Sequence, residues 1–278
     1  RHPHKAIHLK PMGEVGQITL ERGNVTKLDD LGRFVDSSTY VVNLIGILFE
    51  KGAQSFEAVQ AQTPARIAEA AAAAGVKQLV QMSAIGADPE SDAAYGRTKA
   101  MGEEAVRRHF PDAVILRPSV VFGPEDDFFN RFGQMAQMSP FLPLIDGGTT
   151  RFQPVYVDDV ARAVMVALTD PGTRGRTFEL GGPDVYTFKE LLEYLLGLLH
   201  RKRMLLTLPS NVARVQARFM EFLPKPPLTR DQIALLAEDN VVSAGAETLA
   251  DLGIEPTPLE VVVPGYVERY AKRRPRGL

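Results

Sequence analysis

Residues 78–124 read QLVQMSAIGADPESDAAYGRTKAMGEEAVRRHFPDAVILRPSVVFGP, and this stretch decides the fold of the 278-residue chain. Two apolar runs in it, 78–83 and 113–117, have the length and composition of buried strands. The segment between them is expected to be a helix that carries Tyr95 and Lys99. A strand, a helix and a second strand in succession form the repeating unit of a parallel sheet.

Tyr95 and Lys99 stand four residues apart and therefore share one face of that helix. A free phenol, with a pKa of about 10, is a weak acid–base group at neutral pH, and an ammonium beside it favours the phenolate. The pair is therefore a candidate for hydride-transfer chemistry. The same spacing is common on solvated helix surfaces, so the prediction of a catalytic pair depends on the neighbouring strands.

The alternation of strands and helices extends on both sides of this stretch. We expect further strands at residues 17–21, 40–45 and 177–180, and helices at 27–35, 58–74, 159–169 and 187–200. Strands that alternate with helices of this length imply right-handed crossovers and a parallel sheet covered on both faces. The sequence therefore predicts an α/β, doubly wound, Rossmann-type core.

The glycine-rich turn that would place backbone N–H groups against a dinucleotide pyrophosphate is not found. Gly13 and Gly16 have neither a strand before them nor a helix after them. Either the first strand, turn and helix of the fold lie upstream of Arg1, as we expect, or a true truncation has removed them and nucleotide binding with them. A sheet that truly lacked its central strand would expose two edges.

We divide the chain near residue 150. Residues 1–150 are expected to form the nucleotide-binding core, and residues 151–278 a mixed region that completes the sheet and forms a smaller helical cap or docking surface. One helix of this region, 211–223, carries apolar residues at helical spacing, which suits a partner groove, a membrane interface or an ordinary core equally. Its stripe is Val212, Val215, Phe219, Phe222 and Leu223. The chain ends in a basic segment, 272–276.

Composition excludes several classes of function. A formal charge of −2 gives no reason to expect nucleic-acid binding, and the absence of cysteine excludes disulfides and thiolate metal sites. The longest apolar run, 40–49, is about half the length of a membrane-spanning helix. We assign no metal, because Asp158 and Asp159 begin a helix, where carboxylates cap N–H groups, and the histidines at 2, 4 and 8 lack a carboxylate partner.

The order of a strand ending in Ser83, a YxxxK helix and a strand with the turn RPxxVxGP (117–124) resembles the extended or atypical branch of the short-chain dehydrogenase/reductase superfamily. The resemblance implies catalytic positions at Tyr95, Lys99 and Ser83, unless Ala84 takes the hydroxyl position and leaves the triad vestigial. It also implies a nicotinamide nucleotide, whose contacts would be Arg1, Asn24, Val25, Asn43, Gly46, Ser83, Tyr95, Lys99, Pro118, Ser119 and Val120.

Each of these implied contacts has its own part. Asn24 and Val25 would hold the adenine or serve only as turn residues, and Asn43 to Gly46 would lie beside the adenosine ribose. The turn from Pro118 to Val120 would contact the nicotinamide carboxamide. Arg1 would pair with the 2′-phosphate of NADP(H), or simply be solvated.

Four segments, 42–46, 117–130, 153–160 and 177–183, narrow the resemblance to the NADPH-binding accessory subunit of respiratory complex I, of alphaproteobacterial or mitochondrial type. This implies NADPH, or NADH, held as a structural cofactor without turnover. It also implies partners in the peripheral arm near the quinone site, and a peripheral place on the cytoplasmic face of the bacterial inner membrane or on the mitochondrial matrix face. The alternative is an independent NADP-dependent reductase, epimerase or dehydratase acting on a sugar nucleotide or similar substrate.

Overall fold

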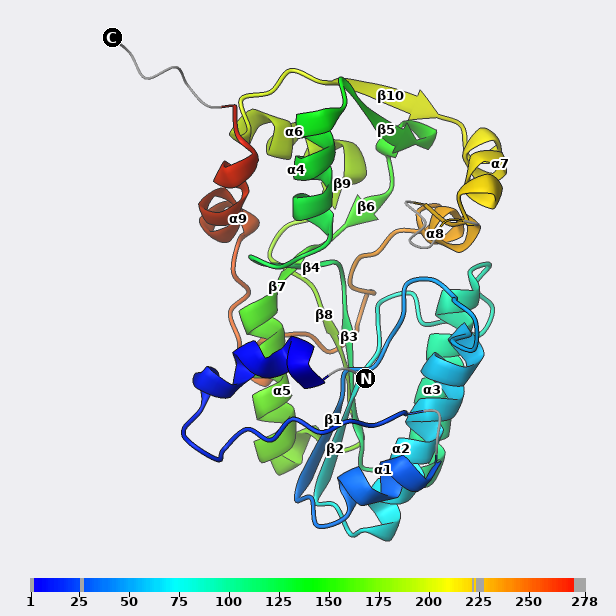
Figure 1. The fold of residues 1–278 in the computed structure, drawn as a ribbon, viewed down its shortest axis with the longest axis vertical. Coiled ribbons are helices and arrows are strands. Elements are labelled where there is room, and N and C mark those ends of the chain that lie inside the picture. Colours follow the sequence, from blue (N-terminus) through cyan, green and yellow to red (C-terminus); the bar gives the residue numbers. More distant parts are fainter. Residues whose placement is uncertain (1–2, 26–27, 222, 224–227, 273–278) are drawn as a thin grey trace.

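A parallel four-stranded sheet forms the centre of the lower half of the molecule (Figure 1). The structure is a computed structural model and describes residues 3–25, 28–221, 223 and 228–272. The sheet order is β1 (Tyr40–Asn43), β2 (Gln78–Met82), β3 (Val114–Pro118) and β8 (Thr177–Leu180). Val42 pairs with Val80, and Val80 with Val114. The strands expected at 40–45, 78–83, 113–117 and 177–180 are thus confirmed within one or two residues.

Helices cover both faces of this sheet, which confirms the doubly wound, parallel α/β core. On one face lie α1 (Leu28–Val35), α2 (Thr63–Ala73) and α3 (Ala94–His109), and on the other lies α5 (Val157–Thr169) (Figure 1). Leu31, Ile67 and Val106 pack with Leu79 in one apolar cluster, and Ala163 packs with Val80 and Phe178 in the other. Successive residues of β2 therefore point to opposite faces of the sheet and pack against the two helical layers, as in any strand covered on both faces.

Two expected elements differ in the structure. Residues 17–21 form no strand but an irregular segment after the 3₁₀ helix η1 (Pro3–Met12), because they pair with no strand edge. The helix expected at 58–74 begins as a π-helical segment, η2 (Glu57–Gln62), before α2 continues it. The hydroxyl of Thr63 donates to the carbonyl of Ala58 at 2.8 Å at this junction.

The upper half of the molecule has its own core. There α4 (Phe128–Met138), α6 (Phe188–Leu198) and α9 (Leu259–Val267) pack around Phe129, Leu191, Leu195 and Val263 (Figure 1). Helix α6 begins with a capping box between Thr187 and Glu190, which confirms the start expected for it. Three two-stranded sheets complete this half: β4 (Val121–Phe122) with β7 (Val155–Tyr156), β6 (Arg151–Phe152) with β9 (Tyr186–Thr187), and β5 (Phe141–Ile145) with β10 (Met204–Leu208).

Helix α7 (Ser210–Met220) presents its apolar stripe outward. Ala213 and Ala217 are buried against Ile145 and Ile233, the latter on α8 (Arg230–Leu235). The larger side chains on the remaining surface are exposed, at 44% for Val212, 60% for Val215, 70% for Phe219 and 52% for Leu223. Of the alternatives left open by the sequence, an ordinary core-facing helix is therefore wrong for these residues. Phe222 and the end of the basic segment, 273–276, lie outside the described residues.

No helix in the described parts of the chain is long and apolar enough to cross a membrane.

Candidate functional site

The carboxyl ends of β1, β2 and β3 lie at the same edge of the sheet, where open α/β folds bind ligands. Asn43 ends β1 and is buried. Its side-chain amide donates to Oε1 of Gln81 at 2.8 Å, and its Oδ1 accepts the backbone N–H of Ile45 at 3.1 Å. Asn43 therefore fixes the turn that leads from β1 to Gly46.

Lys99 brings three of the expected residues together. Its Nζ donates to the carbonyl of Met82 at 3.3 Å and lies 5.7 Å from the centre of the Tyr95 ring. A Cβ built on Gly46 would lie 3.6 Å from the same Nζ. The Tyr95–Lys99 pair on α3, the end of β2 and the turn after β1 thus meet at one point.

Ser83 follows β2 directly, and its hydroxyl has no partner. The residue is only 4% exposed, and its Oγ makes no hydrogen bond within the described structure. Leaving a buried hydroxyl unpaired costs about 1–3 kcal/mol. A polar ligand group at this edge of the sheet would remove that cost. The nicotinamide nucleotide implied by the sequence fits here, since Ser83 and Lys99 supply polar groups and Gly46 leaves space beside Lys99.

The electrostatics of the Tyr95–Lys99 pair are the reverse of what the spacing suggested. Burial, and then the carboxylate of Asp231, raise the pKa of Tyr95 to about 12. Burial lowers the pKa of Lys99 to about 8, opposed by Glu103. The expectation that Lys99 tunes Tyr95 toward its ionised form is therefore wrong in this structure. At neutral pH the phenol keeps its proton.

Asp231 is a residue that the sequence did not single out. Its two carboxylate oxygens accept the backbone N–H groups of Ala94, at 2.6 Å, and of Tyr95, at 3.1 Å. A carboxylate is favourable at a helix N-terminus, so α8 is held against the first turn of α3. The sequence Thr229 to Gln232 signals the start of α8 through its capping box, but nothing local shows which helix Asp231 contacts.

Hydrogen bonds from other parts of the protein fix the turn from Pro118 to Val120. The hydroxyl of Ser119 lies 2.8 Å from the carbonyl oxygen and 2.7 Å from Oδ1 of Asn240. Pro118 accepts a hydrogen bond from Ile85, and Val120 one from Val155, both at 3.0 Å. The side chain of Ser119 is therefore engaged, and Asn240, in a segment without a recognisable motif, was missed.

The remaining residues expected to contact the nucleotide lie away from the Tyr95–Lys99 pair or outside the described residues. Val25 packs against the apolar cluster that Ile45 also contacts, and its carbonyl accepts from Thr63 at 3.5 Å. Asn24 precedes it in the same loop. Arg1 lies outside the described residues.

Asp159 does not cap its helix as expected. It is fully buried, and its carboxylate accepts the backbone N–H of Thr257 at 2.7 Å. The carboxylate of Asp159 thus binds a distant backbone N–H group and not one at the start of its own helix. Across residues 3–25, 28–221, 223 and 228–272, no group of three or more His, Asp or Glu side chains could hold a metal ion.

A cleft of about 420 Å³ opens between the tyrosine helix and the C-terminal helices. Its walls carry the carboxylates of Glu50, Glu221 and Asp231, and Arg230, the one cation among the described residues that line it, is paired with Glu221 at 3.0 Å. The aromatic wall is Phe49 and Phe56, and Phe56 packs edge-on against Tyr95. The cleft therefore adjoins the Tyr95–Lys99 pair but is acidic.

Comparisons with known proteins identify the family of the chain. The model of the NAD dependent epimerase/dehydratase family matches residues 2–181. Subunit 9 of the NADH dehydrogenase [ubiquinone] 1 alpha subcomplex from Arabidopsis thaliana is 36% identical over 96% of this chain and 69% of its own length. The 40 kDa subunit of NADH-ubiquinone oxidoreductase from Neurospora crassa is 31% identical over 95% of this chain and 69% of its own length.

Among solved structures, MoeE5 in complex with UDP-glucose and NAD superposes with a TM-score of 0.73 at 16% identity, over 95% of this chain and 93% of its own. At that identity the similarity supports a shared fold and no more. The chain therefore belongs to the NAD dependent epimerase/dehydratase family, together with the alpha subcomplex subunit 9 and 40 kDa subunits of mitochondrial NADH-ubiquinone oxidoreductase.

Proposed function

We propose that this protein is an accessory subunit of respiratory complex I that holds NADP(H), or NAD(H), as a structural cofactor without turning it over. The observation that carries the nucleotide-binding part is the unpaired, buried hydroxyl of Ser83 beside the assembled Tyr95–Lys99 pair. The membership part is supported by relatives at 31–36% identity that are named as subunits of NADH-ubiquinone oxidoreductase.

The bound nucleotide would lie along the carboxyl edge of the sheet. Ser83, Tyr95 and Lys99 would face the nicotinamide ribose, the turn from Pro118 to Val120 the carboxamide, and Asn43 and Gly46 the adenosine ribose. Asn24 and Val25 would hold the adenine. Arg1 would select NADP(H) by pairing with its 2′-phosphate.

Turnover is disfavoured by the state of Tyr95. Burial and the carboxylate of Asp231 raise the pKa of the phenol to about 12, so very little of it is present at neutral pH as the phenolate that would act as the base. Asp231 also fixes α8 across the first turn of α3. These contacts support a protein that keeps a nucleotide in place.

The assembled Tyr95–Lys99 pair favours a second candidate, the independent reductase, epimerase or dehydratase. The adjoining cleft speaks against a sugar-nucleotide substrate. A pyrophosphate there would face three carboxylates, while Arg230, the one cation among the described wall residues, is already paired with Glu221. The accessory function is therefore the better supported of the two.

Membership would place the chain in the peripheral arm near the quinone site, on the cytoplasmic face of a bacterial inner membrane or the matrix face in mitochondria. The exposed stripe of α7 supports docking, because four large apolar side chains at 44–70% exposure are available to a partner or a membrane surface. Residues 151–278 would thus supply the docking surface, and residues 1–150 most of the nucleotide site.

Two measurements test the proposal. Protein purified intact from its own membranes should release NADP(H) or NAD(H) on denaturation, and finding neither would contradict nucleotide binding. In mild detergent it should migrate with NADH:ubiquinone oxidoreductase activity, and migration alone would contradict membership.

The variant Tyr95→Phe distinguishes a protein that only binds its nucleotide from an enzyme that turns it over. It removes one hydroxyl and keeps the ring against Phe56, so the protein should stay folded and keep its nucleotide. The change should cost at most about 1 kcal/mol, the typical contribution of one hydrogen bond. A steady oxidation of NADPH by a carbonyl or sugar-nucleotide substrate, lost in Tyr95→Phe, would establish the second candidate instead.

A further inference from the structure

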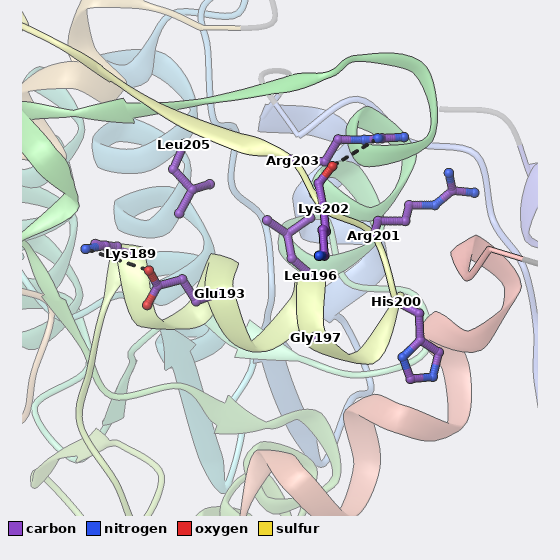
Figure 2. Close-up of a pocket in the computed structure, with 9 residues that line it drawn as sticks. All are labelled: Lys189, Glu193, Leu196, Gly197, His200, Arg201, Lys202, Arg203 and Leu205. Atoms are coloured by element: carbon purple, nitrogen blue, oxygen red, sulfur yellow. Dashed lines mark hydrogen bonds and ion pairs between the residues drawn. The ribbon is translucent and has the colours of Figure 1, made fainter.

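A large hollow lies in the upper half of the molecule, between the carboxyl end of α6 and the start of β10. Its volume is about 740 Å³. Figure 2 shows Lys189 and Glu193 at one end and the run from His200 to Arg203 at the other. We call this the basic hollow, and its lining residues are Lys189, Glu193, Leu196, Gly197, His200, Arg201, Lys202, Arg203 and Leu205.

The charge of the basic hollow is unbalanced. Four cationic side chains and one carboxylate line it, and that carboxylate, of Glu193, lies 3.7 Å from Lys189 and away from the other three cations. No carboxylate in the described part of the chain pairs with Arg201, Lys202 or Arg203. The carboxyl end of α6 attracts cations, but a helix dipole amounts to only about half an elementary charge there. Most of the positive charge is therefore available to a ligand.

The two arginines are fixed by the protein. Nε of Arg201 donates to the carbonyl of Tyr270 at 2.9 Å, and Nε of Arg203 donates to that of Ala136 at 2.8 Å. These bonds hold the two side chains and leave the Nη atoms of Arg201 and Nη2 of Arg203 without an acceptor among the described residues. A guanidinium held in this way loses little further conformational entropy when it binds an anion.

Apolar residues adjoin the charges. Leu196 and Leu205 line the hollow itself. A hollow with cationic ends and an apolar wall suits a ligand that joins a phosphate to a hydrocarbon part.

We propose that the basic hollow binds a phosphate group, either of a phospholipid head group or of a free phosphate compound. Arg201, Lys202 and Arg203 would bind the phosphate at their end of the hollow, Lys189 at the other end would add to the attraction for an anionic ligand or surface, and Leu196 and Leu205 would contact the apolar neighbour of the phosphate. This site is separate from the edge of the sheet where the nucleotide would lie, so its test does not depend on that of the proposed function.

The experiment compares two double variants of the full-length protein as it is isolated, with or without a bound nucleotide. K189Q/K202Q removes two cations that make no backbone contact in the structure, so it should fold normally. K10Q/K77Q removes two exposed lysines elsewhere and is the matched control. Each protein is titrated with phosphatidylcholine vesicles, with vesicles that also contain phosphatidylglycerol, and with inorganic pyrophosphate in separate runs.

We expect the wild type and K10Q/K77Q to bind equally, and K189Q/K202Q to bind roughly 30-fold more weakly, as expected for two cations near an anionic surface. A difference seen only with phosphatidylglycerol vesicles identifies a lipid head group as the source, and one seen with pyrophosphate as well identifies a phosphate that need not be part of a lipid. Equal binding by both double variants, or no binding of either anionic probe by the wild type, would overturn the proposal.

Discussion

The carboxylate of Asp231 accepts the backbone N–H of Tyr95 at 3.1 Å, across 136 residues of sequence. A C-terminal helix is thereby fastened to the helix that carries the Tyr95–Lys99 pair. The same carboxylate contributes to the raised pKa of the Tyr95 side chain, after burial. One residue thus joins the two halves of the molecule and opposes ionisation of the candidate catalytic phenol.

The substitution Asp231→Asn should lower the pKa of Tyr95 from about 12, yet leave it above the ordinary value because the burial remains. It should also reduce the free energy of unfolding by about 1 kcal/mol, since an amide is a weaker partner for a helix N-terminus than a carboxylate. Ultraviolet difference titration against Tyr95→Phe and denaturant unfolding measure the two effects. Asp92→Asn, at an exposed carboxylate nearby, is the control and should change neither quantity. An unchanged Tyr95 pKa in Asp231→Asn would contradict the electrostatic role.

Replacing Lys99 with Met should stabilise the nucleotide-free protein at about pH 7, because a buried ammonium is exchanged for an apolar side chain. The pKa of Lys99 is lowered from 10.5 to about 8 in the folded state. Below about 8 both states carry the proton and the cost of the buried charge is complete. Between about 8 and 10.5 the unfolded state binds more protons, so the stability of the wild type rises with pH.

The advantage of Lys99→Met should therefore shrink as the pH is raised from about 8 toward 10.5. Urea unfolding at a series of pH values measures this. Lys77→Met, at an exposed lysine, should show no such trend. A constant difference between Lys99→Met and the wild type at every pH would show that Lys99 is not desolvated.

Arg117 joins α3 to the sheet through Glu103, at 2.6 Å, and Glu179, at 3.4 Å. Both carboxylates are buried, so Arg117→Met should destabilise the fold by about 3–5 kcal/mol by leaving them unpaired. Adding Glu103→Gln should restore part of the loss. The control Arg108→Met breaks an exposed pair with Glu104 and should cost at most about 1 kcal/mol. Equal losses for the two arginines, measured by denaturant unfolding, would argue against a buried network.

Gly102 marks the closest approach between α3 and η2. A Cβ at this position would lie 2.1 Å from the backbone carbonyl oxygen of Gln60, so Gly102→Ala should cost about 1–3 kcal/mol or more. Gly32→Ala is the matched control, because nothing lies within 4 Å of a Cβ there. It should gain up to about 1 kcal/mol from helix propensity. Thermal unfolding of both variants should move in opposite directions, and a tolerated Gly102→Ala would show that the two helices can separate.

The sequence predicted the elements that carry a strong local pattern. Strands β2 and β3 have continuous apolar runs, and α6 has a capping box, so each was located to within about two residues. Residues 17–21 have a similar apolar content and yet form no strand, because a strand exists only where an edge is available to pair with it. Local pattern cannot show whether that edge is present.

The sequence by itself determined the family, the parallel core and the meeting of Lys99 with Tyr95, since these follow from spacing along one helix and the order of strands around it. Only the tertiary structure decided the state of that pair. Burial and Asp231 raise the pKa of Tyr95, whereas the spacing predicted a lowered one. The hydroxyl of Ser119 donates a hydrogen bond to the side chain of Asn240. Both partners come from segments more than 100 residues away in the chain. Desolvation and long-range contacts depend on what the whole chain packs around a side chain, and no short stretch of sequence encodes them.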